Sequence, residues 1–229
     1  MKALSSNLFN CKIIGESLVI QGLRPFKILS SAVLNGGLTT CEAIVNKQVS
    51  AMFQVEECEE YLIEEMLKLG LNPQTAAGFL TAADVRDFAA SHMRGEGLSV
   101  TCIATAGLSH PAIPGDDVVD DELNTINIFL LVEADLTDAA MVNAVQTVTE
   151  AKVHALNTLG VKSLYSGEWA TGTTTDATAI CSWNIGRKLK FTGAATPLGK
   201  LIGKTVFSAV SRSATKWLRR QSNRGTTSL

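Results

Sequence analysis

The sequence predicts an α+β domain in which helices cover a mixed or antiparallel β-sheet, and three observations support this expectation. Of the 229 residues, 46% are apolar and 18% are charged, which suffices for a substantial core. The apolar runs follow the order strands, helix, strands, helix, strand and helix. No fixed-period repeat, low-complexity block or linker divides the chain. We therefore expect a single domain that spans residues 1–229.

The first half of the chain is expected to hold strands and one helix. The segments "ESLVIQG" and "FKILSSAVL" are short, rich in β-branched residues and bounded by Gly or Pro, which is typical of strands. The run "EAIVNKQVSAMFQV" follows after the connection "NGGLTTC", whose paired glycines permit positive φ. Residues 56–69 carry Leu, Ile and Met at helical spacing after several glutamates, and Gly70 follows them. This stretch therefore predicts a helix.

The second half is expected to hold two more helices and several strands. Residues 113–124 are acidic and predict a solvated surface loop. Thr137 can cap a long helix over residues 138–159, and Gly160 can end it. The remaining elements are expected as strands at 75–83, 98–106, 125–134 and 177–183, a basic helix at about 198–220 and a frayed tail at 221–229.

Charge is distributed unevenly along the chain. All 22 Asp and Glu residues lie at or before Asp176, whereas half of the 20 Lys and Arg residues follow it. A basic C-terminal helix can bind nucleic acid or an anionic surface, or it can pack on the acidic body of the same domain. Few aromatic residues accompany the basic ones, namely Phe191, Phe207 and Trp217. We therefore favour packing and expect no nucleic-acid partner.

The cysteines and the N-terminus bear on the compartment. Five cysteines are scattered without C-x-x-C spacing, which argues against a disulfide framework or a zinc site and favours a reducing compartment. The N-terminal segment has no apolar block of signal-peptide length, and the run "INIFLLV" is too short to cross a bilayer. The three histidines are far apart, so no metal is expected. We expect a cytoplasmic protein without a membrane partner, and the sequence leaves a homo-oligomer open.

Two segments are chemically unusual, although no standard catalytic signature is present. "SSAVLNGG" at 30–37 places Asn35 and two glycines where bare N–H groups can approach a ligand, or it is an ordinary glycine turn. "TGTTTD" at 171–176 offers hydroxyls and a carboxylate, or it is an Asx or Ser/Thr turn that leads into a strand. Glu150 and His154 share a helix face, where a solvated pair is favoured over an acid–base pair.

Eight segments, taken in order, carry a resemblance to a known family. They are "LSSAVLNGG" at 29–37, "VNKQV" at 45–49, "GFLTAADV" at 78–85, "TAGLSHP" at 105–111, "TINIFLLVEADLT" at 125–137, "TVTEAKVHALNTLGV" at 147–161, "ATGTTTDATAI" at 170–180 and "TPLGKLIGKTV" at 196–206. Together they resemble the adenosylcobinamide amidohydrolases of corrinoid salvage. The resemblance covers nearly the whole chain.

The resemblance implies a reaction and a substrate. The reaction would be hydrolysis of the amide between the corrin ring's propionate and the aminopropanol arm of adenosylcobinamide. The products would be adenosylcobyric acid and 1-amino-2-propanol, with cobalt entering as part of the corrinoid and no cofactor of the protein's own. Two positions depart from the family pattern, because His110 stands where the family has Asn and Asn124 where it has Gly. His110 could alter corrinoid preference or introduce a group that titrates near neutral pH.

Roles for individual residues are assigned by chemistry within the matching segments. Asp176 is the expected general base, because it is the only carboxylate in the two glycine-bearing segments. Thr175 or a neighbouring threonine could be a nucleophile or position water, and Asn35 could hold the oxyanion. The expected substrate-binding residues are Ser31, Gly36, Gly37, Asn46, His110, Thr173, Thr174 and Glu150.

Two other functions fit the sequence. The departures at His110 and Asn124 would suit a corrinoid-binding protein without hydrolytic activity. The basic residues after Asp176 would suit a binder of nucleic acid or an anionic surface, whose binding would depend strongly on salt.

Overall fold

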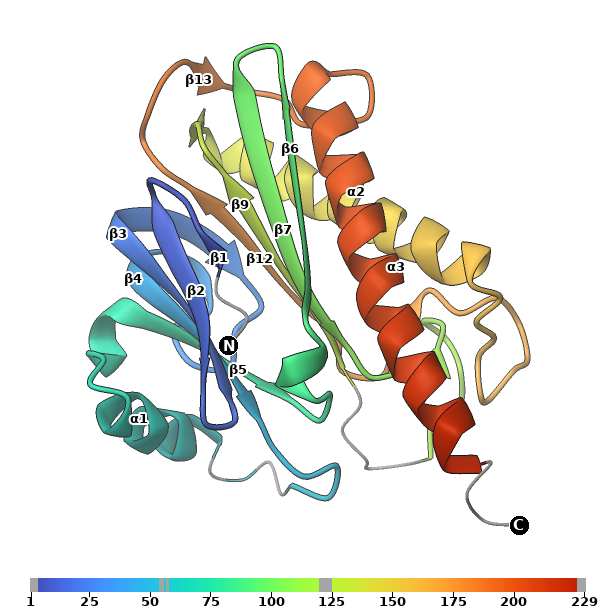
Figure 1. Ribbon diagram of the computed structural model, residues 1–229. Coiled ribbons are helices and arrows are strands. Elements are labelled where there is room, and N and C mark those ends of the chain that lie inside the picture. Colours follow the sequence, from blue (N-terminus) through green and yellow to red (C-terminus); the bar gives the residue numbers. More distant parts are fainter. Residues whose placement is uncertain (1–3, 54–55, 57, 120–124, 226–229) are drawn as a thin grey trace.

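The computed structural model describes residues 4–53, 56, 58–119 and 125–225, and its fold is α+β, as the sequence predicts (Figure 1). Within these residues nine strands form one curled, mixed sheet in the order β1-β2-β3-β12-β9-β7-β6, with β4 paired to β3 and β5 paired to β4. The strands of this sheet are β1 (Leu4–Ser5), β2 (Phe9–Ile14), β3 (Ser17–Ser30), β4 (Gly37–Gln48), β5 (Ala76–Thr81), β6 (Ala89–Gly95), β7 (Leu98–Ala106), β9 (Ile126–Val132) and β12 (Ala177–Ser182).

Shorter elements and helices complete the description. Two short strand pairs lie outside the sheet, β8 (Pro111–Ala112) with β11 (Gly172–Thr173), and β10 (Asp135–Leu136) with β13 (Lys188–Leu189). The α-helices are α1 (Cys58–Lys68), α2 (Asp138–Thr158) and α3 (Pro197–Gly225), and 3₁₀ turns occur at η2 (Pro73–Thr75) and η3 (Val85–Asp87). No helix of the described residues is long and apolar enough to cross a membrane.

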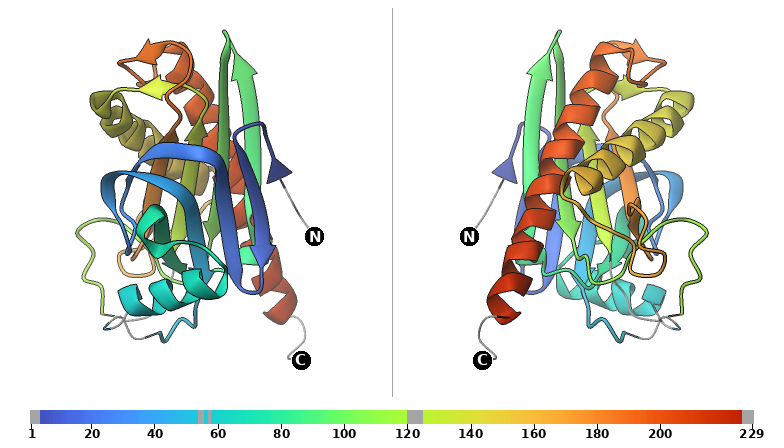
Figure 2. Two further views of the ribbon diagram at one scale, coloured as in Figure 1. Left: turned by 90° about the vertical axis from the view of Figure 1, so that its left-hand side faces the viewer. Right: turned by 90° about the vertical axis from the view of Figure 1, so that its right-hand side faces the viewer.

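The elements stack in layers around three apolar clusters. Helices α2 and α3 cover one face of the β6, β7, β9 and β12 part of the sheet (Figures 1 and 2). Strands β2 to β5 curl over the opposite face, and a second cluster fills the space between the two parts of the sheet. Helix α1 packs on the outside of β4 and β5 over a third, smaller cluster.

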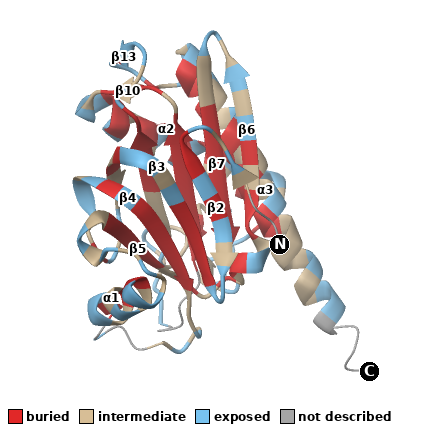
Figure 3. Cartoon of the chain, turned by 60° about the vertical axis from the view of Figure 1, so that its left-hand side comes forward, coloured by how far each residue is buried: buried red, intermediate tan, exposed pale blue. Residues whose placement is uncertain are grey.

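Strand β9 is central to these layers. Figure 3 shows that the middle of the sheet is largely buried. All seven residues of β9 are buried, with alternate side chains in the helix-facing cluster and in the cluster between the sheet parts. A strand covered on both faces reads as a continuous apolar run, which explains "INIFLLV". Asn127 is the polar exception, and it points away from the helices toward Asn46 on β4.

Strand β3 differs from the prediction. The two strands expected at "ESLVIQG" and "FKILSSAVL" form one strand, Ser17–Ser30, whose pairing with β4 shifts register between Gln21 and Phe26. Pro25 lies in this irregular stretch, where its missing N–H breaks no ladder hydrogen bond. The first half of β3 pairs with β2 and the last residues pair with β12, so this strand produces the curl of the sheet.

Other boundaries also depart from the sequence prediction. Strands β2 and β6 were not expected, and β4 begins at Gly37 inside the predicted connection. Helix α2 agrees with its prediction, since the Thr137 hydroxyl accepts a hydrogen bond from Ala140 N and Gly160 has a φ of 73°. Helix α3 continues to Gly225, beyond the predicted end near residue 220, because no Gly or Pro interrupts residues 204–224. The rest of the predicted frayed tail, 226–229, lies outside the described residues.

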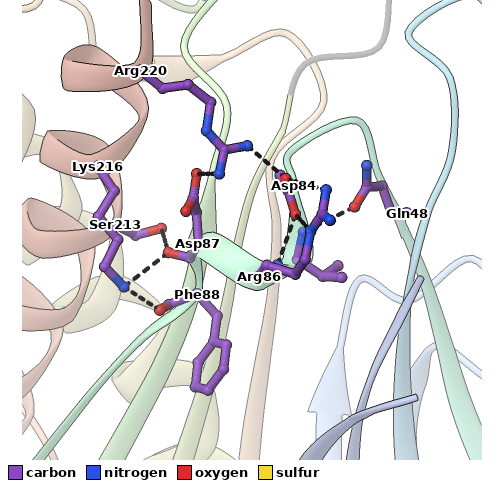
Figure 4. A network of polar contacts seen from close by, with 9 residues as sticks. Gln48, Asp84, Arg86, Asp87, Phe88, Ser213, Lys216 and Arg220 are labelled. Atoms are coloured by element: carbon purple, nitrogen blue, oxygen red, sulfur yellow. Dashed lines mark hydrogen bonds and ion pairs between the residues drawn. The ribbon is translucent and has the colours of Figure 1, made fainter. Parts of the chain in front are cut away.

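The basic part of α3 packs on the body of the domain, as the charge distribution favoured. Arg220 forms ion pairs with Asp84 and with Asp87, at 2.5 and 2.8 Å (Figure 4). Lys216 donates to the carbonyl oxygens of Asp87 and Phe88. Asp84 also caps η3 by accepting from the backbone N–H of Arg86. These contacts fasten α3 to η3 and the residues that flank it, Asp84 and Phe88.

We predict that Asp84→Asn lowers the free energy of unfolding by about 1–3 kcal/mol at neutral pH, because a charged hydrogen-bond acceptor is lost while the cap remains. The Arg86 and Arg220 guanidinium groups hold the pKa of Asp84 well below its ordinary value. A depressed pKa contributes stability above the unfolded pKa of about 4, and this stability is lost as pH falls through the folded pKa. Urea titrations should therefore show the difference between wild type and D84N shrinking as pH falls below about 4.

The exposed Asp117→Asn serves as the control and should change stability little at either pH. A D84N deficit that is the same at neutral and acidic pH would contradict the proposed role of the charge.

Candidate active site

Several of the singled-out segments meet at one edge of the sheet. Strand β12 runs parallel to β9 and antiparallel to the end of β3, and β7 runs antiparallel to β9. The segments 31–36, 107–119 and 171–176, together with Thr125, therefore lie at the same edge of the sheet (Figure 1). Ser31 N donates to the carbonyl oxygen of Thr178, and Thr178 N donates to Ser31 Oγ, so the first segment is tied to the start of β12.

A polar cavity of about 400 Å³ opens at this edge. One wall is the segment 112–118, a second is the segment 171–176, and Lys152 of α2 contributes the third. The β8–β11 pair joins the first two walls, with Ala112 opposite Gly172. The cavity therefore collects residues that are far apart in the sequence.

Asp176 and Lys152 form an ion pair inside this cavity. Lys152 Nζ contacts Asp176 Oδ2, and both side chains are only 14% exposed. Asp176 Oδ1 accepts from the backbone N–H of Ile126 at 3.0 Å and from both the N–H and the hydroxyl of Thr173. Oδ1 thus accepts three hydrogen bonds, whereas the partner of Oδ2 is Lys152.

Gly172 is required by the close approach of this ion pair. A Cβ at Gly172 would overlap the carboxylate of Asp176 and the ammonium of Lys152. The glycine of "TGTTTD" therefore makes room for the pair, and its φ is not positive.

The three threonines of the segment differ in their contacts. Thr173 is held by Asp176, and Thr175 is exposed with its hydroxyl 2.9 Å from that of Thr125. Thr174 lines the cavity, and its buried Oγ1 has no hydrogen-bond partner among the described residues. A buried hydroxyl without a partner is costly, so Thr174 is the threonine whose hydrogen-bonding capacity is open to a ligand.

Asn35 and its neighbours form a tightly held loop. Asn35 has a φ of 55°, and its Nδ2 donates to the carbonyl oxygens of Pro73 and Ala76 at 2.6 and 2.7 Å. A Cβ at Gly36 would lie 2.5 Å from the carbonyl oxygen of Ala32, and Gly37 has a φ of 85°. Both donors of the Asn35 amide are engaged in holding the loop.

The remaining predicted residues lie outside the cavity lining. Asn46 is buried between the sheet parts, where it donates to Thr105 and accepts from Asn127. Glu150 is exposed on α2, as a solvated pair would be, and the His154 ring lies 4.8 Å from that of Phe207. His110 is half-buried between β7 and β8. Asn124 lies outside the described residues.

The sequence analysis did not identify two residues of the cavity. Lys152 was not singled out, although it lies one turn from the buried residues Val148 and Ala155. Asp116 was placed in a solvated loop, but it lines the cavity and accepts from Ser163 Oγ and Ile113 N. These hydrogen bonds, that from Ser163 foremost, hold the pKa of Asp116 below its ordinary value.

A larger cavity of about 610 Å³ lies at the opposite end of β9, near Glu133 and Phe191. Its charged residues have both signs, and Lys188 is exposed and 3.6 Å from Asp135. It contains no buried ion pair comparable to that of Lys152 and Asp176 among the described residues. The smaller cavity is therefore the better candidate for chemistry.

Comparison with known proteins adds an independent observation. The family model for adenosylcobinamide amidohydrolase matches residues 6–222. The adenosylcobinamide amidohydrolase of Methanosarcina mazei is 32% identical over 205 residues, which cover 85% of this chain and 92% of that protein. The one of Halobacterium salinarum is 28% identical over 187 residues, which cover 78% of this chain and 76% of that protein.

An uncharacterized protein of Methanocaldococcus jannaschii is 28% identical over 218 residues, which cover 85% of this chain and 84% of that protein. Because the family model spans nearly the whole sequence, this chain belongs to the adenosylcobinamide amidohydrolase family.

Proposed function

We propose that the protein hydrolyses the amide that joins the corrin ring's propionate side chain to the aminopropanol arm of adenosylcobinamide. The products are adenosylcobyric acid and 1-amino-2-propanol. The observation that carries this proposal is the Lys152–Asp176 pair beside the unpartnered Thr174 hydroxyl, in a cavity of a chain that belongs to this family.

The cavity offers groups for each part of amide hydrolysis, which needs a nucleophile, a site for the oxyanion and a proton for the leaving amine. Asp176 Oδ2 is the oxygen of the carboxylate with the fewest partners, so it is the atom proposed to take a proton from the attacking water. The Lys152 ammonium can stabilise the tetrahedral oxyanion and donate a proton to the amine. Thr174 can hydrogen-bond the substrate carbonyl or the water.

The size of the cavity favours entry of the side arm alone. A space of about 400 Å³ suits a small ligand or one arm of a larger one. The macrocycle with its other side chains must then remain at the mouth. In the proposed reaction the cobalt is part of the substrate, and the catalytic groups are those of Asp176, Lys152 and Thr174, without a metal or cofactor of the protein's own.

The enzyme assay is the direct test. Purified protein incubated with adenosylcobinamide should release adenosylcobyric acid and 1-amino-2-propanol, both identified by mass. Ligand that binds and is recovered unchanged would instead support the corrinoid-binding function without hydrolysis.

Asp176→Asn and Lys152→Met should each lower kcat by at least about 100-fold, because each removes a group that acts on the transition state. Each change also leaves the other member of a largely buried ion pair without its counter-charge, so each should lower the melting temperature. The double variant removes both charges and should regain stability while it remains inactive. The exposed Lys204→Met on α3 is the control for loss of a cation. A folded D176N enzyme with near-normal turnover would remove Asp176 from the mechanism.

Thr174→Val should separate function from stability. Valine keeps the shape of threonine and removes a buried hydroxyl that has no partner in the described protein, so stability should stay equal or rise. We expect kcat/KM to fall by about 10-fold or more, the cost of one lost hydrogen bond to the reacting groups. Thr149→Val, on the exposed face of α2, should leave kcat/KM unchanged. Equal activity of T174V and wild type would show that the hydroxyl does not contact the substrate.

Asn35→Ala distinguishes two roles. The contacts of Asn35 favour a scaffolding role, since alanine would leave two carbonyl groups unpaired and would strain the positive φ. We expect a lower melting temperature and, in the folded enzyme well below that temperature, a kcat within about 10-fold of wild type. A loss of about 100-fold or more in folded protein would restore the oxyanion role.

A further inference from the structure

Exposed apolar side chains occur on two segments that continue into the walls of the polar cavity, 113–119 and 161–171. Main-chain hydrogen bonds from Leu164 to Pro111 and from Thr171 to Ala112 join the second segment to β8, which directly precedes the first. The exposed residues are Val118, Val119, Leu164 and Trp169. Val118 also lines the cavity itself. A polar cavity with an apolar rim suits a ligand that has a polar arm and a broad apolar body.

Trp169 is the largest of these side chains, and it lies two residues before Thr171, which lines the cavity. Trp169 forms a β-bridge and Gly172 and Thr173 form β11, and burial alternates along this stretch, with Ala170 and Gly172 buried. Side chains alternate along an extended segment, so Trp169 shares its side with Thr171 and Thr173. Both threonines line the cavity. Trp169 therefore stands beside the cavity on the same wall.

The indole is also held in place while half of it stays exposed. Trp169 pairs with Lys162 in an antiparallel bridge, and hydrogen bonds from Ser163 N to Glu168 O and from Ala170 N to Val161 O close the hairpin. Lys162 Nζ lies 4.0 Å from the centre of the indole ring. The side chain is nevertheless 50% exposed, unlike Trp183, which is 1% exposed. A fixed and half-exposed indole is a preorganised surface for a flat ligand.

We propose that Trp169 is the platform on which the corrin macrocycle rests while the aminopropanol arm enters the cavity. The inference rests on the proposed function, because it takes the corrinoid as the ligand. The cavity is too small for the macrocycle, and the indole is the broadest fixed apolar surface among the exposed residues of its rim. Trp169 contacts a part of the substrate that does not react, so it contributes equally to binding the substrate and the transition state.

The test separates binding from chemistry. Trp169→Ala should raise KM for adenosylcobinamide by about 10-fold or more, in line with the loss of one aromatic stacking contact, and should leave kcat within about two-fold. Trp169→Phe keeps a stacking ring and should recover most of the affinity. Leu67→Ala removes another exposed apolar side chain, from α1 and outside the cavity lining, and it should change neither constant.

Equilibrium dialysis with the coloured corrinoid gives Kd in the same variants, independently of turnover. A W169A protein whose Kd and KM equal those of wild type overturns the inference and leaves the proposed function intact. A fall in kcat with unchanged Kd also overturns it, since Trp169 would then position the reacting groups. A wild type that binds the corrinoid without hydrolysing it overturns the proposed function, while the Kd of W169A still decides the role of Trp169. A wild type that binds no corrinoid overturns both.

Discussion

The arrangement of the site depends on the contacts of the Asp176 carboxylate. It joins the start of β9 through Ile126 N, the segment 171–176 through Thr173, and helix α2 through Lys152. Removing two charges from water costs several kcal/mol per ion, and this cost is offset only where geometry and further hydrogen bonds are favourable. The four contacts of Asp176 meet that requirement, and Gly172 is small because the pair leaves no room for a Cβ. The same contacts that fix the loop also place a carboxylate and an ammonium at the cavity.

The position of this cavity follows from the burial of β9. A strand that is covered on both faces along its length cannot present polar groups to a substrate at its middle. Polar groups can be reached only where the strand ends, and the edge at Thr125 and Ile126 is where Asp176 and Thr175 meet β9. Asn127, one residue farther in, is already enclosed between the sheet parts with Asn46. Under the proposed function, the chemistry is therefore confined to the loops at this edge.

The fold was predictable to the extent that signals were local. The cap of α2 at Thr137 and its end near Gly160 are local features, and both were predicted correctly. The continuity of β3 was not, because Pro25 normally ends a strand and only the pairing with β2, β4 and β12 shows that it does not. In the site, the sequence located the segment 171–176 but missed Lys152. From sequence, a lysine beside a buried helix face is expected to extend into solvent. Only the tertiary structure shows that a carboxylate distant in sequence lies beside it.

The division between a polar cavity and an apolar rim bears on how one amide is selected among several. Under the proposed function the substrate carries several amide side chains, and Lys152, Asp176 and Thr174 are proposed to act on the one that bears aminopropanol. Placement of the ring would then contribute to selection, because a macrocycle held in one orientation brings one arm to the reacting groups. Under the proposed function, the rigid hairpin that carries Trp169 would hold the ring in that placement, equally in the bound substrate and in the transition state. The rim would thus determine which arm enters the cavity, and the charged groups of the cavity would act on the amide of that arm.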